Sequence, residues 1–474
     1  MNDEVKDCLI VCQTSEGVDI HATLTKLDRY FVVFEIYGPG GILRASEVLN
    51  DFKIIIRNRT IYSGRATIRS LVGTGQIEVC EATLTESSWM ELEFTPSMTR
   101  NGELGEKFNG FIRDWQKHYK IQTEYKIIVA DMQSFFMDLR LWLDQVELGI
   151  RAAPAADRSQ LEKEAADQLA RPIIPCMNTL FEKFENIAME LEEEVRQAHR
   201  NYMRRQLHPL ILCAPFAHRT FVKPLGYAGD YEMVNMIIRN GHEGGSLYAK
   251  LVNLWFLQQP PAEAHRNRVQ YLKTRLLEET ARAARLGHPA RILNLGCGPA
   301  GEIREFLKES PLSDNARFTL LDFNDETIEY ARVGLRGVKT EFKRNAGLQF
   351  QKKSVLQLLK EAAKPAGDKP RQQYELVYCA GLFDYLTDRT CKQLMDIFYE
   401  WTAPGGLLIA TNVEPANPLR NGMEHLLDWN LIYRTAAQMR LVKPQEADRD
   451  SINVFSDSTG VNVLLEVRKP QNGG

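Results

Sequence analysis

The feature that most constrains this chain is a strand–turn–helix unit over residues 290–307. Residues 292–295 are an apolar run that predicts a short buried strand, and helical character resumes after the turn. The turn carries three glycines, Gly296, Gly298 and Gly301. Glycine permits a sharp turn and lets backbone N–H groups approach a ligand, toward which the following helix points its positive end. On its own the unit indicates either a nucleotide-type site or a tight structural turn.

Strands and helices alternate on the C-terminal side of this unit. Apolar runs predict strands at residues 317–323, 348–356, 374–379 and 407–412, with helices at 326–334 and 388–401. Two further runs, 451–455 and 460–468, flank a turn and predict a terminal hairpin. This alternation is typical of an α/β doubly wound, mainly parallel sheet, to which the hairpin would add an antiparallel strand. Residues 286–474 are assigned to this domain.

The first 98 residues have a different character. Hydrophobic and polar residues alternate through Ile20, Ala22 and Leu24, which is the period of a half-buried strand. Further strands are expected at residues 31–37, 52–57, 60–71 and 76–84, and Cys8 and Cys12 lie in another strand-like run. Half a dozen short strands with tight turns predict a small all-β barrel over residues 1–98.

Residues 99–205 switch to helical periodicity and predict a helical bundle or spacer. One apolar stripe runs from Ile127 to Val146, and a second begins after Pro172 and Pro175. The Ala-rich stretch before these prolines is expected to be a connection or a shorter helix. Because such stripes are packing surfaces, a homodimer through this region is one expectation.

Residues 206–285 are expected to be a helical cap that leads into the sheet domain. The segment 226–231 contains Tyr227, Asp230 and Tyr231 and is too aromatic for an ordinary linker. It indicates either a structured loop packed on the next domain or a cap that closes over a substrate pocket. A helix broken at Pro260 and Pro261 is expected to follow.

Bulk composition excludes several classes of protein. The formal net charge of −3 gives no global basic field for nucleic acid. The eight cysteines never form a C-x-x-C pair, so we expect a reducing compartment and no structural zinc. No apolar run is long enough to cross a membrane, and the first residues do not resemble a signal peptide. A cytoplasmic protein is the simplest expectation.

Two cofactors fit the glycine turn, a nicotinamide dinucleotide and S-adenosylmethionine. Both use the first strand–helix turn and an acidic residue after the second strand, where Asp322 follows Gly296 by 26 residues. Downstream features distinguish them. The segments 294–301 and 379–384, with Asp322, the Pro404-Gly405-Gly406 turn and the terminal hairpin, resemble the class I S-adenosylmethionine-dependent methyltransferases in order and spacing.

This resemblance implies S-adenosylmethionine as the cofactor and no metal. Asp322 would hold the ribose, Phe323 and Asn324 would flank the adenine, and Ser354 and Val355 would lie by its amine edge. The implied cofactor-binding residues are Asn294, Gly296, Cys297, Gly298, Gly301, Asp322, Phe323, Asn324, Ser354, Val355 and Ala380.

One position departs from the pattern of that family. Asn294 stands where the family usually has an acidic residue that helps to hold the methionine ammonium. An amide oxygen can accept a hydrogen bond, but the charge is missing, so part of this contact must come from elsewhere. Asp384 and Asp230 are the candidates.

A narrower resemblance joins the cap to the sheet domain. The segments 223–231, 294–299 and 381–386 resemble a bacterial group associated with the synthesis of 3-hydroxypalmitic acid methyl ester, a quorum signal called the extracellular factor. The resemblance implies O-methylation of the carboxylate of a 3-hydroxy fatty acid or a similar acyl amphiphile. The catalytic candidates are Tyr227, Asp230, Tyr231, Asp384 and Arg434.

The acceptor decides which side chains the reaction needs. A carboxylate is ionised at neutral pH and needs no general base, and Arg219, Lys223 or Arg434 could hold its charge. A hydroxyl or amine acceptor would instead need a base, for which His218, His425, Asp384 and Tyr227 are the candidates. Residues 421–434 mix apolar and polar groups that suit either an acyl-chain site or a helix covering the sheet.

The N-terminal barrel resembles a PilZ domain, the bacterial cyclic di-GMP receptor. Arg65 and Arg69 match the R-x-x-x-R spacing of that family, but they lie inside a predicted strand and no D/N-x-S-x-x-G motif follows. We therefore expect a PilZ-like barrel that does not bind cyclic di-GMP. The uncharged Asn294 leaves one functional alternative open, a signalling or scaffold protein that binds the cofactor with little or no turnover.

Overall fold

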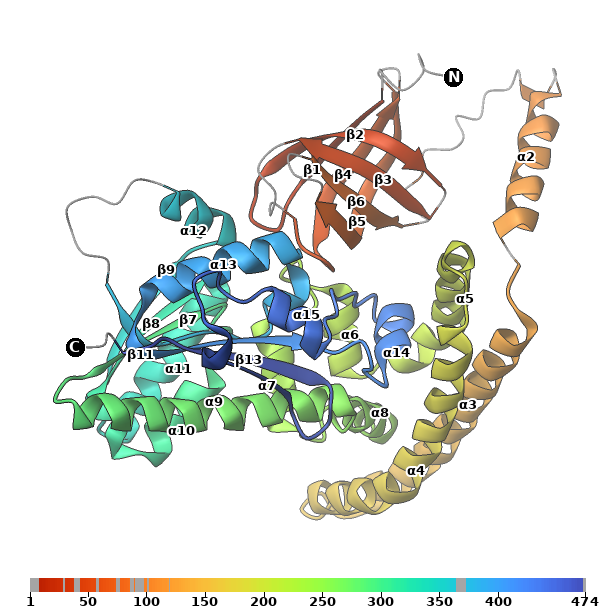
Figure 1. The fold of residues 1–474 in the computed structure, drawn as a ribbon. Coiled ribbons are helices and arrows are strands. Elements are labelled where there is room, and N and C mark those ends of the chain that lie inside the picture. Colours follow the sequence, from red (N-terminus) through yellow and green to blue (C-terminus); the bar gives the residue numbers. More distant parts are fainter. Residues whose placement is uncertain are drawn as a thin grey trace.

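The computed structural model describes residues 8–28, 30–37, 43–56, 59–73, 77–85, 89, 98–99, 102–118, 120–363 and 372–471. The chain forms an N-terminal barrel, a set of long helices and a C-terminal domain built on one sheet (Figure 1). In the view of Figure 1 the barrel lies above the sheet domain, and α3, α4 and α5 lie beside it.

Six antiparallel strands close the N-terminal barrel in the order β1-β2-β3-β6-β5-β4. The alternation seen in the sequence places every second side chain inside, where Phe34, Phe52 and Tyr62 are fully buried. The predicted small barrel is confirmed. Its strands are β1 (Cys8–Gln13), β2 (Asp19–Leu27), β3 (Phe31–Tyr37), β4 (Val48–Ile56), β5 (Arg59–Gly73) and β6 (Ile77–Leu84).

Four helices follow, and they correct one expectation. They are α2 (Glu103–His118), α3 (Thr123–Ala152), α4 (Arg158–Met189) and α5 (Glu193–Ile211). The second apolar stripe was expected to begin after Pro172 and Pro175, whereas α4 is one helix of 32 residues that contains both prolines. Its buried face is continuous from Ala166 to Ala188, so packing against α3 outweighs the roughly 3 kcal/mol cost of an internal proline.

The predicted helical cap consists of four helices. They are α6 (Pro215–Val222), α7 (Tyr231–Arg239), α8 (Leu247–Leu257) and α9 (Pro260–Arg285). Asp230 caps α7 by accepting hydrogen bonds from the backbone N–H groups of Glu232 and Met233. The break expected at Pro260 and Pro261 is the start of α9, where proline fits because the first helical turn has no partner for its N–H.

A seven-stranded sheet forms the C-terminal domain, in the order β12-β13-β11-β10-β7-β8-β9. The strands β11, β10, β7, β8 and β9 run parallel to one another. β13 lies between β11 and β12 and is antiparallel to both. The predicted doubly wound sheet with a terminal antiparallel hairpin is thereby confirmed. The strands are β7 (Ala290–Leu295), β8 (Ala316–Asp322), β9 (Gly347–Lys352), β10 (Tyr374–Cys379), β11 (Thr402–Val413), β12 (Ile452–Ser456) and β13 (Asn462–Arg468).

Helices cover this sheet and connect its strands. They are α10 (Gly301–Glu309), α11 (Asp325–Glu341), α12 (Val355–Ala362), α13 (Asp388–Trp401), α14 (Arg420–Leu426) and α15 (Ala436–Leu441). The strand expected over 348–356 is shorter than predicted. It ends at Lys352 because Ser354 and Gln357 form a capping box that starts α12.

The barrel docks on the sheet domain through residues 43–48. The Ala45 N–H donates to the Tyr385 carbonyl at 3.2 Å, and the Val48 N–H donates to the Gly226 carbonyl at 2.8 Å. Ser46 Oγ donates to the Asn430 carbonyl at 2.7 Å and accepts from the Asn430 N–H at 2.6 Å. Only glycine fits at 226, because a Cβ there would lie 2.7 Å from Ser15 Cβ. We call residues 43–47 the barrel loop.

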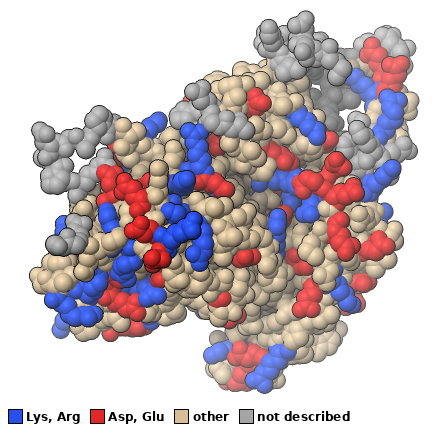
Figure 2. All heavy atoms as spheres, viewed as in Figure 1, with Lys and Arg blue, Asp and Glu red and all other residues tan. Residues whose placement is uncertain are grey.

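Acidic and basic side chains are interspersed over the face drawn in Figure 2. No helix within the described ranges has the length and apolar character needed to span a bilayer. Within the same ranges, no group of three or more His, Cys, Asp and Glu side chains is placed to hold a metal ion.

Candidate functional site

A deep cavity lies where β7, β8 and β10 end, and the glycine turn forms part of its wall. The turn is tied to the neighbouring strand, because the N–H groups of Gly296 and Cys297 both donate to the Leu321 carbonyl, at 2.8 and 3.1 Å. Gly298 has a positive φ of 51° and turns its own N–H toward Asp322 Oδ2, at 3.2 Å. The positive φ values of the turn explain why the sequence needs glycine there.

Asp322 is a buried carboxylate at the end of β8 that lines the same cavity. It accepts from the Gly298 N–H and, at 3.1 Å, from the Asn324 N–H. Burial raises the pKa of Asp322, while these two donors and the Arg44 guanidinium oppose the increase. The structure therefore keeps an acceptor carboxylate beside the glycine turn, which is the arrangement that a ribose hydroxyl pair requires.

Phe323 and two aromatic or cationic neighbours form the next part of the wall. The ring centroids of Tyr227 and Phe323 lie 5.2 Å apart. The guanidinium carbon of Arg44 lies over the Phe323 ring, 4.1 Å from its centroid. Arg44 belongs to the barrel loop, so the N-terminal domain contributes a residue to this cavity. Sequence reasoning missed Arg44, because no local pattern marks it.

Asn294 is buried at the end of β7 and contacts an acid that sequence reasoning did not select. Its amide Nδ2 donates to Glu302 Oε1 at 3.1 Å, and the Tyr378 hydroxyl donates to the same oxygen at 2.7 Å. Glu302 is itself buried and lines the cavity. Burial raises the pKa of Glu302, opposed by the Tyr378 hydrogen bond and the positive charge of Arg268. A carboxylate thus lies beside the position where Asn294 lacks one.

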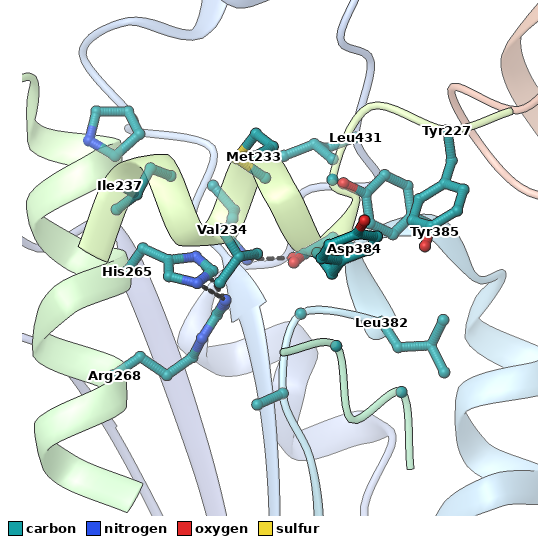
Figure 3. Close-up of a pocket in the computed structure, with 18 of the residues that line it drawn as sticks. Tyr227, Met233, Val234, Ile237, His265, Arg268, Leu382, Asp384, Tyr385 and Leu431 are labelled. Carbon is teal, nitrogen blue, oxygen red and sulfur yellow. Dashed lines mark hydrogen bonds between the residues drawn. The ribbon is translucent and has the colours of Figure 1, made fainter. Parts of the chain in front are cut away.

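Arg268 reaches the cavity from α9 (Figure 3). Its Nη2 donates to His265 Nδ1 at 2.7 Å. Its guanidinium also packs against Gly381, where an added Cβ would lie 3.1 Å from Nη2. Burial lowers the pKa of Arg268, with Asp384 opposing the decrease, and burial beside Arg268 and Arg266 lowers the pKa of His265. His265 is therefore a neutral acceptor for the arginine.

Asp384 and Tyr385 follow β10 and line the cavity beside Tyr227 (Figure 3). Asp384 Oδ1 accepts from the Val413 N–H at 2.6 Å, and burial raises the pKa of Asp384. The Tyr385 hydroxyl accepts from Trp429 Nε1 at 3.0 Å. A Cβ at Gly229 would lie 2.5 Å from that hydroxyl, so the cap and the β10 loop meet closely at this wall.

The remaining wall is apolar and comes from the cap and from residues 417–431. Figure 3 shows Met233, Val234 and Ile237 of α7 together with Leu431 around the cavity. Phe256, Leu419, Met423, Leu427 and Trp429 complete this side, which we call the apolar chamber. Met423, Leu427 and Trp429, from the segment 421–434 that was considered for an acyl chain, therefore line the cavity.

Most of the predicted site residues meet in this one cavity. Those that line it are Tyr227, Tyr231, Asp384, Asn294, Gly296, Cys297, Gly298, Gly301, Asp322, Phe323, Val355 and Ala380. Tyr231 also donates its hydroxyl to Glu326 at 2.7 Å and stacks on Tyr330. Gly301 lies close to α7, since a Cβ there would be 2.9 Å from Ile238 Cδ1.

Four other predicted residues carry structural hydrogen bonds outside the cavity lining. Asp230 caps α7 and pairs with Arg219 at 2.8 Å. Asn324 and Ser354 cap α11 and α12 through their side chains. Arg434 is buried and donates to the carbonyls of Phe383 and Leu386 and to Asn412, which joins the β10 loop to β11.

The other cations considered for a carboxylate are also engaged by the protein. Lys223 is buried, and its Nζ donates to the Asp428 carbonyl at 2.9 Å, with the Asp428 carboxylate at 3.5 Å. Arg219 is held by Asp230. Among the bases considered, His425 is buried and bonded to the Tyr125 hydroxyl at 2.8 Å. None of these three is part of the described cavity lining.

No protein-family model matches the sequence, and no curated protein matches it. Solved structures do resemble the fold. A possible exported protein from Bordetella parapertussis is 16% identical, with 64% of this chain and 97% of that chain covered and a TM-score of 0.42. Magnesium protoporphyrin IX methyltransferase from Synechocystis PCC 6803 with bound SAH is 12% identical, with 44% and 84% covered and a TM-score of 0.31.

A third resemblance is to the N-methyltransferase NodS from Bradyrhizobium japonicum WM9 in complex with S-adenosyl-l-homocysteine. It is 16% identical, covers 51% of this chain and 98% of that chain, and has a TM-score of 0.30. At these scores the similarity assigns neither an activity nor a ligand to this chain.

Proposed function

We propose that this protein is an S-adenosylmethionine-dependent O-methyltransferase that methylates the carboxylate of a 3-hydroxy fatty acid or a similar amphiphilic small molecule. One observation carries the proposal. A single cavity joins the glycine turn and Asp322 to the apolar chamber, so a polar cofactor and an apolar acceptor chain can lie end to end.

When bound, the cofactor would supply a methyl group on a sulfonium: the bond from the acceptor oxygen to the methyl carbon would form as the methyl–sulfur bond breaks, and S-adenosylhomocysteine would leave as a neutral thioether. The residues of this chain bind and orient it. Asp322 accepts the ribose hydroxyls, and Phe323 with Arg44 and Tyr227 encloses the adenine. The Gly296–Gly298 backbone allows the close approach of the methionine portion. Enclosure by α7 and the barrel loop excludes water, and alignment supplies most of the rate acceleration.

The apolar chamber favours an acyl chain over a small polar acceptor. Met233 and Ile237 on α7, with Leu427 opposite, bury the chain at about 25 cal/mol per Å² of apolar surface. A carboxylate head group is already ionised at neutral pH, so no proton has to be removed before transfer. We assign the hydroxyls of Tyr227 and Tyr385, both of which line the cavity, to orienting this carboxylate.

The barrel is proposed as a PilZ-like module whose role is docking and not cyclic di-GMP binding. Both arginines of the R-x-x-x-R spacing are used in contacts within this chain. Arg65 Nη2 donates to the Val222 carbonyl at 2.9 Å, and Arg69 pairs with Glu81 and Glu193. The homodimer through the helical region stays a prediction, for which Leu141 and Trp142 on α3 are exposed apolar candidates.

The test uses the purified full-length protein. Calorimetry compares S-adenosylmethionine with NADH, and binding of the first alone is expected. Methyl-labelled S-adenosylmethionine is then incubated with 3-hydroxyhexadecanoic acid, with octanoic acid and with a cell lipid extract. Label that enters an organic-soluble, base-labile ester supports the proposal.

Two results would contradict it. Binding of S-adenosylmethionine without transfer to any acceptor fraction would favour the scaffold alternative. Label in a base-stable product would show methylation of a nitrogen or a hydroxyl oxygen in place of a carboxylate.

A further inference from the structure

Two opposite charges in the cavity are not used by the functions assigned above. Glu302 and Arg268 are both buried, and both line the wall beside the glycine turn. Each stabilises the charge of the other electrostatically. In the part of the chain that the structure describes, however, no carboxylate lies within 4.0 Å of the Arg268 guanidinium, so the two are not an ion pair.

Leaving two buried charges apart is costly. Removing a charged group from water is unfavourable unless an opposite charge contacts it. The local structure nevertheless holds both groups in place. Asn294 and Tyr378 fix the Glu302 carboxylate, and His265 with Gly381 fixes the Arg268 guanidinium. Two fixed, separated and opposite charges are complementary to a ligand that carries a cationic and an anionic group on one carbon.

Glu302 places a carboxylate beside Asn294, where the expected negative charge is missing. Asn294 lacks the negative charge expected at the end of β7, and Glu302 Oε1 is 3.1 Å from its amide. The carboxylate therefore enters the same place from the first turn of α10, eight residues later in the chain. No sequence comparison of strand ends would reveal this exchange, because it depends on the folded turn.

We propose that Glu302 and Arg268 hold the zwitterionic amino-acid end of S-adenosylmethionine, Glu302 contacting the ammonium and Arg268 the carboxylate. This inference rests on the proposed function, since it assigns residues to the cofactor of that function. Charge-assisted hydrogen bonds to carboxylate and ammonium are about twice as strong as neutral ones, which would offset the burial of both protein groups.

The test measures binding, not turnover, with three ligands. S-adenosylmethionine carries both charges of the amino-acid end, decarboxylated S-adenosylmethionine keeps only its ammonium, and methylthioadenosine lacks this end. Glu302→Gln should weaken the first two ligands by tenfold or more and leave methylthioadenosine within twofold. Arg268→Gln should weaken S-adenosylmethionine by tenfold or more and leave the other two within twofold.

A charge exchange provides the matched control. The double variant Asn294→Asp/Glu302→Gln moves the carboxylate from α10 back to β7 and should recover most of the lost affinity. Arg268→Lys should keep part of the affinity for S-adenosylmethionine that Arg268→Gln loses, since lysine keeps the charge but not the fork of donors. Thermal unfolding of each variant shows whether the fold is retained, and the methylthioadenosine affinity reports an intact adenosine site.

The outcomes separate this inference from the proposed function. Wild-type protein that fails to bind S-adenosylmethionine would overturn the proposed function itself. Wild-type binding that Glu302→Gln leaves unchanged would overturn the inference alone. An Arg268→Gln variant with unchanged cofactor affinity and a raised acceptor KM would assign Arg268 to the acceptor carboxylate and overturn that half of the inference.

Discussion

The two ends of the cavity are assembled in different ways. The end proposed for the cofactor, the cofactor end, comes chiefly from the carboxyl ends of three parallel strands: Asp322 is the last residue of β8, and Gly296–Gly298 and Ala380 directly follow β7 and β10. The end proposed for the acceptor, the acceptor end, comes from segments far apart in the chain, chiefly α7 and residues 417–431. A topological rule places the first set together, since the carboxyl ends of parallel strands share one edge of a sheet. Tertiary packing alone places the second set.

This difference has a consequence for mutation. The acceptor wall shares its core with the long helices, because Leu419, Leu426 and Leu427 pack in the same cluster as α3, α4 and α5. Glu185 of α4 further accepts from the Gly422 N–H at 2.6 Å at the start of α14. Substitutions at the acceptor end should therefore affect stability together with function, whereas substitutions at the cofactor end should affect binding first.

The largest effect is expected at Asp322. Asp322→Ala removes the acceptor of two backbone N–H groups and of the two ribose hydroxyls. The binding of S-adenosylmethionine should weaken about 100-fold, because two charge-assisted hydrogen bonds to the ribose, of about 1.5 kcal/mol each, are lost. Calorimetry measures this loss, and circular dichroism checks the fold. Gly298→Val, which places a branched side chain at a φ of 51°, should give a similar loss. Unchanged affinity in both variants would remove the basis for a cofactor site at this edge.

The next effect concerns the stability of the acceptor wall as pH falls. His208 on α5 bonds to the Leu426 carbonyl at 2.8 Å, and burial, aided by Arg204, lowers its pKa from 6.5 to about 4. The unfolded chain therefore takes up this proton before the folded protein does. The contribution of His208 to the free energy of unfolding is full above pH 6.5 and falls as the pH drops from 6.5 to 4. At pH 5 it is lower by about 2 kcal/mol.

Chemical denaturation at pH 7.5 and pH 5 measures this loss. Other buried groups also titrate, so the relevant quantity is the difference between the wild type and His208→Gln, whose side chain keeps a donor for the Leu426 carbonyl. The wild type should lose about 2 kcal/mol more than the variant on acidification. Equal losses in the two proteins would show that His208 titrates normally.

A smaller effect is expected inside the apolar chamber. Val234→Phe adds bulk between α7 and the acceptor, and should reduce activity on long acyl acceptors by about tenfold, which is the scale of discrimination in apolar pockets. The cofactor affinity should change less than the activity, because Val234 lines the apolar chamber from α7. Val234→Ile is the matched control. Equal losses for short and long acceptors would contradict an acyl site along α7.

The two ends of the cavity also differ in how far the sequence predicts them. The barrel, the doubly wound sheet with its terminal hairpin and the glycine turn follow from local patterns, namely period-two alternation, the alternation of strands and helices, and strand-end glycines. The acceptor end has no such pattern, since Met233, Val234 and Ile237 lie on an ordinary helical repeat of α7. Ser354 illustrates the opposite case. Its Ser-x-x-Gln pattern was present in the sequence, and it predicts the cap of α12 that the structure contains.

Arg44 does not fit this division, because the barrel loop carries it into the cofactor end. Its guanidinium lies 4.1 Å from the Phe323 ring, and its charge opposes the raised pKa of Asp322. Arg44→Gln should weaken the binding of S-adenosylmethionine about three- to tenfold, because the Phe323 ring loses the cation that holds it in the cavity wall, a contact of about 1 kcal/mol. Arg65→Gln is the control, since it removes a contact between the barrel and Val222 outside the cavity.

Calorimetry on the two variants separates docking from direct cofactor contact. If Arg44→Gln weakens the cofactor and Arg65→Gln does not, the barrel takes part in cofactor binding through one side chain. Equal weakening by both would mean that the barrel acts through the position of its loop, held by Ser46 and Asn430. If neither variant changes the affinity, the barrel takes no part in cofactor binding, and Arg268 of α9 remains the contribution of a distant segment to the cofactor end.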